Sequence, residues 1–157
     1  MSPEPLPLRA HHLLCAEEFR GLGYTQKFAA NFARILEELN GRPGTPVRLI
    51  EGPDAICAAC PWLSAEGCLR GDEGEKAVSR LDELVCARLG LEPGAVMSWA
   101  DLGALLASRA DRAWRLSVCR DCSWFGSPCY GEEESIPPRR KDMVKNSFTP
   151  ACRDNKE

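Results

Sequence analysis

Apolar residues recur at helical spacing along residues 25–40, a stretch bounded by residues that favour helix ends. Thr25 has a side chain suited to capping the first turn, and Gly41 and Pro43 are typical of a helix end. The apolar positions in between lie three or four residues apart, at Phe28, Phe32, Ile35, Leu36 and Leu39. This pattern predicts a core helix that ends near Asn40.

Two later stretches show the same periodicity. Residues 75–89 end at Gly90, a residue favoured at helix C-termini, and carry one apolar stripe. The stripe consists of Val78, Leu81, Leu84, Val85 and Leu89. Ser98 is a favourable N-cap for the next amphipathic segment, whose inward positions are Leu102, Leu105 and Leu106. We therefore expect two further helices, followed by a short segment at residues 113–118.

The remaining patterned segments are short. Residues 9–19 are compatible with a helix, and Gly21 and Gly23 would end it. Residues 46–50 alternate and are rich in branched side chains, which predicts a short strand. Together these patterns predict an α+β fold that is predominantly helical, in one small domain with one or few short strands.

Two groups of cysteines share one pattern, and we call them the first and the second knuckle. The first knuckle is Cys57, Cys60 and Cys68, and the second is Cys119, Cys122 and Cys129. Each opens with a C-x-x-C pair preceded by an apolar residue and followed by a tryptophan, Trp62 or Trp124. A C-x-x-C turn lets both sulfurs face one metal atom, so the repeat predicts a thiolate-ligated metal or iron–sulfur site.

Several ligand sets are compatible with this pattern. Each knuckle could hold its own metal with a fourth ligand from elsewhere, or the two C-x-x-C pairs could converge on one site and leave Cys68 and Cys129 spare. Cys60 is followed by Pro61, as in bacterial ferredoxins, and the two tryptophans could shield a redox centre from water. These details favour an iron–sulfur cluster, with zinc as the alternative.

The N-terminal helical segment offers the additional ligands. His11 and His12 precede Cys15 by four and three residues, so either imidazole can share a helix face with that thiol. One interpretation makes these residues co-ligands of the metal. The other makes Cys15 a small core residue and the histidines local hydrogen-bonding groups, and the sequence leaves both open.

Composition narrows the function classes. The net charge is −3, from 20 basic and 23 acidic residues mixed along the chain, so nucleic acid is not an expected partner. No export signal and no long uncharged apolar run is present, which predicts a cytoplasmic protein without a membrane segment. Nine cysteines, an odd number, then favour bound metal over disulfides in a reducing compartment.

The last residues differ from the rest of the chain. Residues 132–157 contain acidic and basic runs and few residues that could fill a core, so we expect a mobile charged tail after a metal-binding domain at residues 1–131. Cys152 lies in this tail and is not an expected ligand. Cys86 lies in the helical segment 75–89 without a nearby cysteine, which favours a packing role.

Three parts of the chain together resemble the DUF1284 family of small prokaryotic proteins. They are the run from Arg9 to Cys15, the Cys57-x-x-Cys60-Pro61 turn, and Cys119-x-x-Cys122-x-Trp124 with Cys129. The resemblance covers residues 8–131. It implies iron–sulfur binding but no particular reaction, and it points to Cys15, Cys57, Cys60, Cys68, Cys119, Cys122, Cys129 and the pair His11 and His12.

Three functional hypotheses follow. The first is an iron–sulfur protein with a 4Fe–4S cluster, acting in electron transfer with a protein redox partner or as the redox component of a larger system. The second is a zinc-stabilised interaction module. The third is an enzyme that uses Cys15 as a nucleophile beside a histidine, or an open metal position. The glycine-rich phosphate loop, the G-x-S-x-G elbow and the H-E-x-x-H helix are absent from the sequence.

Overall fold

The computed structural model describes residues 3–120 and residue 122. The elements in chain order are β1 (Leu6–Leu8), α1 (Ala10–Glu18), α2 (Gln26–Gly41), β2 (Pro46–Leu49), the 3-10 turn η1 (Cys57–Ala59), β3 (Leu63–Ser64), β4 (Gly67–Cys68), α3 (Glu75–Leu89), β5 (Val96–Ser98), α4 (Trp99–Arg109) and α5 (Arg112–Cys119). The predicted tail, Trp124, Cys129 and Cys152 lie outside the described residues. The predicted α+β class with predominant helix is confirmed.

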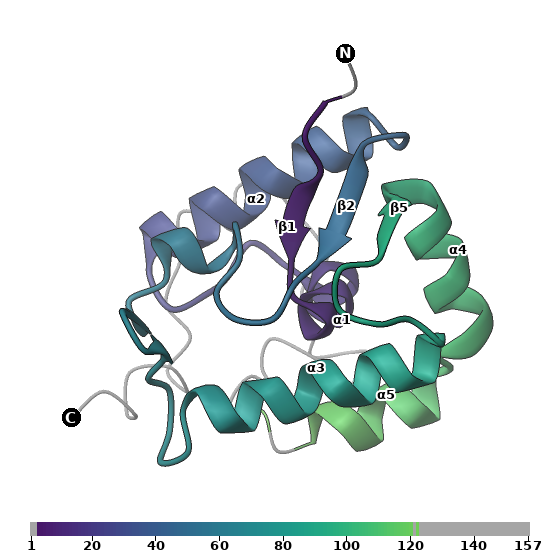
Figure 1. The fold of residues 1–157 in the computed structure, drawn as a ribbon. Coiled ribbons are helices and arrows are strands. Elements are labelled where there is room, and N and C mark those ends of the chain that lie inside the picture. The colour runs from purple at the N-terminus through teal and green to yellow at the C-terminus, as the bar shows by residue number, and fades with distance from the viewer. Residues whose placement is uncertain (1–2, 121, 123–157) are drawn as a thin grey trace, which may run out of the picture.

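A small sheet brings three distant segments together in the order β1, β2, β5. β1 runs parallel to β2, and β5 pairs with the other edge of β2 in the antiparallel direction. Figure 1 shows α2 passing behind β1 and β2, and α4 beside β5. The sequence predicted β2 but neither partner strand, because each has three residues and β1 contains Pro7, which is tolerated at a sheet edge.

The predicted helix ends are confirmed by their hydrogen bonds. The Thr25 hydroxyl accepts a hydrogen bond from the backbone N–H of Phe28 at the start of α2. Ser98 accepts one from the N–H of Asp101 at the start of α4. At the end of α3, Gly90 adopts a left-handed conformation with φ of 70°, which glycine reaches without steric cost.

One predicted core position in α3 is wrong. Leu84 was expected to point inward, but its side chain is 51% exposed. The buried apolar positions Val78, Val85 and Leu89 define a face of the helix that does not include residue 84. The same face includes Asp82, a carboxylate that is buried among them and that belongs to the site described below.

The core lies between the sheet and the helices that surround it. α1 packs against α3, which places the start of α1 deep in the molecule. α3 also meets α5, where the Arg88 guanidinium lies 5.4 Å from the centre of the Trp114 ring. Within the part of the chain that the structure describes, no helix combines the length and the apolar character needed to cross a bilayer.

Candidate metal centre

Eight of the nine residues predicted as metal ligands line one pocket. They come from four segments: His11, His12 and Cys15 from α1, Cys57 and Cys60 from the first C-x-x-C turn, Cys68 from β4, and Cys119 and Cys122 from the end of α5. The ninth, Cys129, lies outside the described residues. The first knuckle and the C-x-x-C pair of the second therefore face the same pocket, as expected if the core brings them to one end of the domain.

The two C-x-x-C turns have the same backbone hydrogen bond. The N–H of Cys60 donates to the carbonyl of Cys57 at 2.8 Å, and the N–H of Cys122 donates to the carbonyl of Cys119 at 2.9 Å. This bond closes a tight turn in which both thiols of a pair can face one side. All four of these cysteines, and also Cys68, are partly buried and carry free thiols.

The wall of the pocket between the cysteines is largely apolar. Trp62 is only 6% exposed and lines the pocket together with Phe28 and Phe32. The Tyr24 ring lies edge-on to both Phe28 and Trp62. These side chains limit the access of water to the thiols, which strengthens electrostatic interactions inside the pocket.

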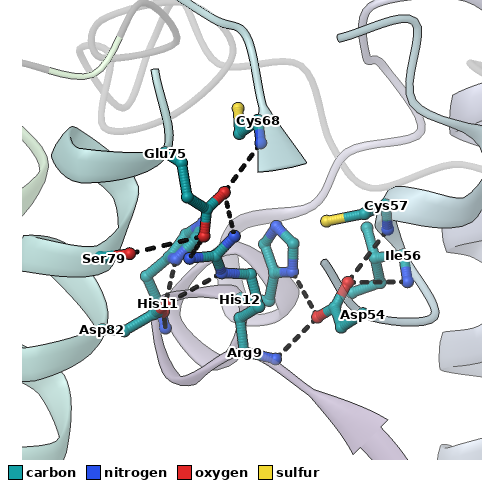
Figure 2. A network of polar contacts seen from close by, with 10 residues as sticks. All are labelled: Arg9, His11, His12, Asp54, Ile56, Cys57, Cys68, Glu75, Ser79 and Asp82. Atoms are coloured by element: carbon teal, nitrogen blue, oxygen red, sulfur yellow. Dashed lines mark hydrogen bonds and ion pairs between the residues drawn. The ribbon is translucent and has the colours of Figure 1, made fainter. Parts of the chain in front are cut away.

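Asp54 connects the first knuckle to α1. One carboxylate oxygen, Oδ1, accepts hydrogen bonds from the N–H groups of Ile56 and Cys57, both at 3.0 Å. The other oxygen, Oδ2, accepts from the backbone N–H of Arg9 at 2.7 Å and from His12 Nδ1 at 2.6 Å. Figure 2 shows Asp54 between these four donors. The carboxylate thus fixes both the turn that carries Cys57 and the ring of His12.

Asp82 holds the other histidine, His11, in a similar way. Its Oδ1 accepts from His11 Nδ1 at 2.6 Å and from the His11 backbone N–H at 3.0 Å. Its Oδ2 accepts from Arg9 Nε at 2.8 Å. Arg9 is 1% exposed and also forms an ion pair with Glu75 at 2.7 Å. Glu75 in turn accepts from the N–H of Cys68 at 2.8 Å, so the network extends to the third cysteine of the first knuckle.

The carboxylates decide which nitrogen of each histidine carries the proton. An ionised carboxylate only accepts hydrogen bonds, so the Nδ1 atoms of His11 and His12 must be the donors in neutral rings. Their Nε2 atoms are then unprotonated and available to a metal. In Figure 2 the edge of the His12 ring opposite Asp54 points toward the space between Cys57 and Cys68. Imidazoles that ligate metals usually have such a carboxylate on the other nitrogen.

Burial governs the ionisation of this network. Burial, together with the neighbouring His12, lowers the pKa of His11 to about 4, so its ring is neutral at pH 7. Burial disfavours the charge on Asp54, but the interactions with His12 and with the backbone N–H groups outweigh it and hold the Asp54 pKa well below its usual range. Burial and the negative charge of Asp54 raise the pKa of Cys57 far above its usual value. Without metal, Cys57 is therefore a thiol rather than a reactive thiolate.

Arg70 places a positive charge on the side of the second knuckle. Its Nη1 donates to the Tyr24 hydroxyl at 2.7 Å and lies 3.7 Å from the sulfur of Cys122. The guanidinium lines the same pocket as the cysteines. A cation in this position would offset the negative charge that several thiolates bring to a metal.

One set of possible ligand atoms is already close together. An oxygen of Asp54, a ring nitrogen of His12 and the sulfur of Cys57 all lie within 4.8 Å of one another. The Asp54 oxygens already accept four hydrogen bonds, which leaves little capacity for a metal. We therefore regard His12 and Cys57 as the better candidate ligands of the three.

The sequence predicted the cysteines and histidines of the pocket but not the polar network behind them. Arg9, Asp54, Glu75 and Asp82 were not among the predicted site residues. A signal was present for Asp82, a single carboxylate on the apolar face of a helix, and this usually means a buried partner. Cys86, predicted as a packing residue, is buried in the main core and does not line the cysteine pocket.

Comparison with known proteins gives one match. The family model described as "Protein of unknown function (DUF1284)" matches residues 23–128, which include both C-x-x-C pairs but begin after His11, His12 and Cys15. No curated protein and no solved structure matches the chain.

Proposed function

The chain belongs to the DUF1284 family, whose description gives no function, and we propose that it binds one iron–sulfur cluster shared by its two knuckles. The observation that carries this proposal is the convergence of six cysteines from four segments on one pocket. A cubane cluster takes four thiolates, so the described cysteines are sufficient in number without Cys129.

The surroundings of the cysteines support a cluster. All seven cysteines of the described residues are free thiols, so none of those in the pocket is committed to a disulfide. The apolar wall formed by Trp62, Phe28 and Phe32 would limit solvent access, and Arg70 would offset negative charge near Cys122. Both factors are among those that set the reduction potential of a cluster.

A cluster in this pocket gives the chain a role in electron transfer, either with a protein partner or inside a larger redox system. A reducing compartment such as the cytoplasm would keep the thiols available. The high pKa of Cys57 does not favour a nucleophilic role for that thiol, and the enzyme hypothesis, which uses Cys15 or an open metal position, stays a prediction.

Zinc is the second candidate. The specific observation in its favour is the short separation, within 4.8 Å, of a nitrogen of His12 and the sulfur of Cys57. Mixed nitrogen and sulfur ligands in a closed site are typical of structural zinc, which would make the chain a metal-stabilised interaction module.

Metal analysis after anaerobic purification separates the two candidates. We expect iron and acid-labile sulfide in similar amounts, with a broad charge-transfer absorption near ~400 nm that makes the protein brown. A colourless protein with stoichiometric zinc would favour zinc, the second candidate, over the cluster. A chain that contains neither metal, as purified or after reconstitution with iron and sulfide, would refute the proposal.

A matched pair of variants tests whether α1 belongs to the centre. Cys15 lines the pocket, whereas Cys86 is a buried core residue outside it. We expect Cys15→Ser to lower the metal content per chain and Cys86→Ser to leave it unchanged. Equal retention of metal in both variants would reduce Cys15 to a packing residue.

A further inference from the structure

We propose that Asp54 is a positioning residue that fixes His12 with Nδ1–H toward the carboxylate and Nε2 toward the pocket, so that His12 Nε2 and Cys57 Sγ both serve as ligands of the same metal centre. This inference rests on the proposed function, because it specifies a ligand that the cysteine pattern alone leaves open. It assigns mixed imidazole and thiolate coordination to the first knuckle.

The Asp54 carboxylate has little remaining capacity to bind a metal. Asp54 is fully enclosed, with 0% of its side chain exposed, and its two oxygens accept four hydrogen bonds. A carboxylate offers about four acceptor positions, so coordination of a metal by Asp54 would break existing bonds. Asp54 is therefore suited to support the ligand residues rather than to bind the metal itself.

The same carboxylate contacts both proposed ligand residues. Through Oδ2 it holds the His12 ring at 2.6 Å, and through Oδ1 it holds the backbone N–H of Cys57 at 3.0 Å. The sulfur of Cys57 and a ring nitrogen of His12 lie within 4.8 Å of each other. Two ligands of one tetrahedral metal ion lie about 3–4 Å apart, and terminal ligands on two irons of one cluster lie further apart, so the His12 ring and Cys57 are close enough to serve one centre.

His12 differs from His11 in what its carboxylate partner holds. His11 has its own carboxylate, Asp82, and the two imidazole rings are 4.3 Å apart between centres. Asp82 has no bond to the turn of the first knuckle among the hydrogen bonds of the described residues, whereas Asp54 bonds to that turn twice. His12 is therefore the imidazole whose position is tied to that of a cysteine ligand.

The experiment uses the full chain and the variant Asp54→Asn. Asparagine keeps one carbonyl oxygen for the N–H groups of Ile56 and Cys57, but it turns an NH2 group toward His12 Nδ1. Two donors cannot pair, so His12 should move its proton to Nε2, where it blocks coordination. We expect the metal of Asp54→Asn to be removed by about ten- to hundred-fold lower EDTA concentrations than that of the wild type.

A double-mutant comparison shows whether Asp54 acts through His12. If it does, Asp54→Asn causes almost no further loss of metal retention in a His12→Ala background. If Asp54 only holds the turn of Cys57, the same fold-change appears in both backgrounds, and this result overturns the inference. Asp82→Asn serves as the matched control, because it disturbs His11 and leaves the bonds of Asp54 in place.

A second readout needs neither a variant nor a bound metal. Long-range nitrogen–proton correlation spectra of the full metal-free chain should show His12 as the Nδ1–H tautomer at neutral pH. An Nε2–H tautomer in the wild type overturns the inference even if the protein binds a cluster. Conversely, a wild-type chain that binds no metal refutes the proposed function and the ligand role of His12 together, so the failures of the two proposals are distinguishable.

Discussion

The two C-x-x-C turns have the same spacing and the same internal hydrogen bond, but they are anchored differently. The first turn is held from behind by the buried carboxylate of Asp54 and by the Asn31 side chain, which donates to the carbonyl of Ala55 at 3.0 Å. The second turn begins at Cys119, the last residue of α5, and Cys122 has the Arg70 guanidinium nearby. Among the described residues, the first pair is thus held by the Asp54 and Asn31 side chains, whereas the second pair lies at a helix end with a long-range contact from Arg70.

This difference indicates that the ligand pattern and its support are separate properties of the sequence. The spacing of a C-x-x-C pair determines how its two sulfurs can be placed relative to each other. It does not determine what holds the turn against the core. We infer that Asp54 preorganises the first knuckle.

The largest effect is expected from removal of the anchor of the first turn. Asp54→Ala leaves the N–H groups of Arg9, Ile56 and Cys57 and the Nδ1–H of His12 without their acceptor. Buried donors without partners cost about 1–3 kcal/mol each, and partial access of water reduces the sum. We expect the free energy of unfolding in urea to fall by about 3–5 kcal/mol.

Asp72→Ala is the control, because Asp72 is an exposed carboxylate and its removal should change stability by less than about 0.5 kcal/mol. If Asp54→Ala cost no more than this control, the anchoring role of Asp54 would be wrong.

A slightly smaller effect is expected at acidic pH, where protonation of His11 should lower the stability of the fold. His11, which faces Asp82, His12 and Arg9, has a pKa of about 4 in the folded protein, below the ordinary value of 6.5. As pH falls below 6.5 the unfolded chain takes up this proton first, so stability is lost progressively down to about pH 4. The loss for the metal-free chain should reach about 3 kcal/mol.

The neighbouring carboxylates affect folding stability in a different pH range. The pKa values of Asp54 and Asp82 are lowered in the folded protein, so their contributions are retained above the ordinary carboxylate pKa and lost only at lower pH. His11→Gln should therefore flatten the stability profile between pH 6.5 and 4 in urea titrations. An unchanged slope in that variant would show that another group is responsible.

The smallest effect is expected at the second knuckle. Arg70→Met removes the hydrogen bond to the Tyr24 hydroxyl and the contact with the sulfur of Cys122. A hydrogen bond of this kind contributes about 1–2 kcal/mol, so thermal or urea unfolding should shift modestly. A loss as large as that of Asp54→Ala would mean that the second turn is anchored as firmly as the first, against our comparison.

The sequence predicted the features that depend on neighbouring residues and missed those that depend on distant ones. Local patterns predicted α2, α3 and α4 together with the caps Thr25 and Ser98, because these features depend on neighbouring residues. The cysteine spacing predicted the candidate ligands for the same reason. β1 and β5 were missed because strands of three residues depend on pairing with β2.

The support of the site was missed for a related reason. Arg9 contacts Glu75 and Asp82, which lie 66 and 73 residues away along the chain. No local pattern reveals such a partner, although a buried charge implies that one exists. The apolar pattern of α3 wrongly includes the exposed Leu84 and leaves out Asp82, whose carboxylate lies on the buried face.

Metal content in two paired variants shows whether both knuckles share one centre. One carries Cys57→Ser with Cys60→Ser, the other Cys119→Ser with Cys122→Ser, and Cys86→Ser is the control outside the pocket. Because a shared cluster needs thiolates from both turns, each pair should lose nearly all iron and sulfide per chain while the control keeps the wild-type amount. Retention of about half of the metal in each pair would mean two independent sites and would contradict the account.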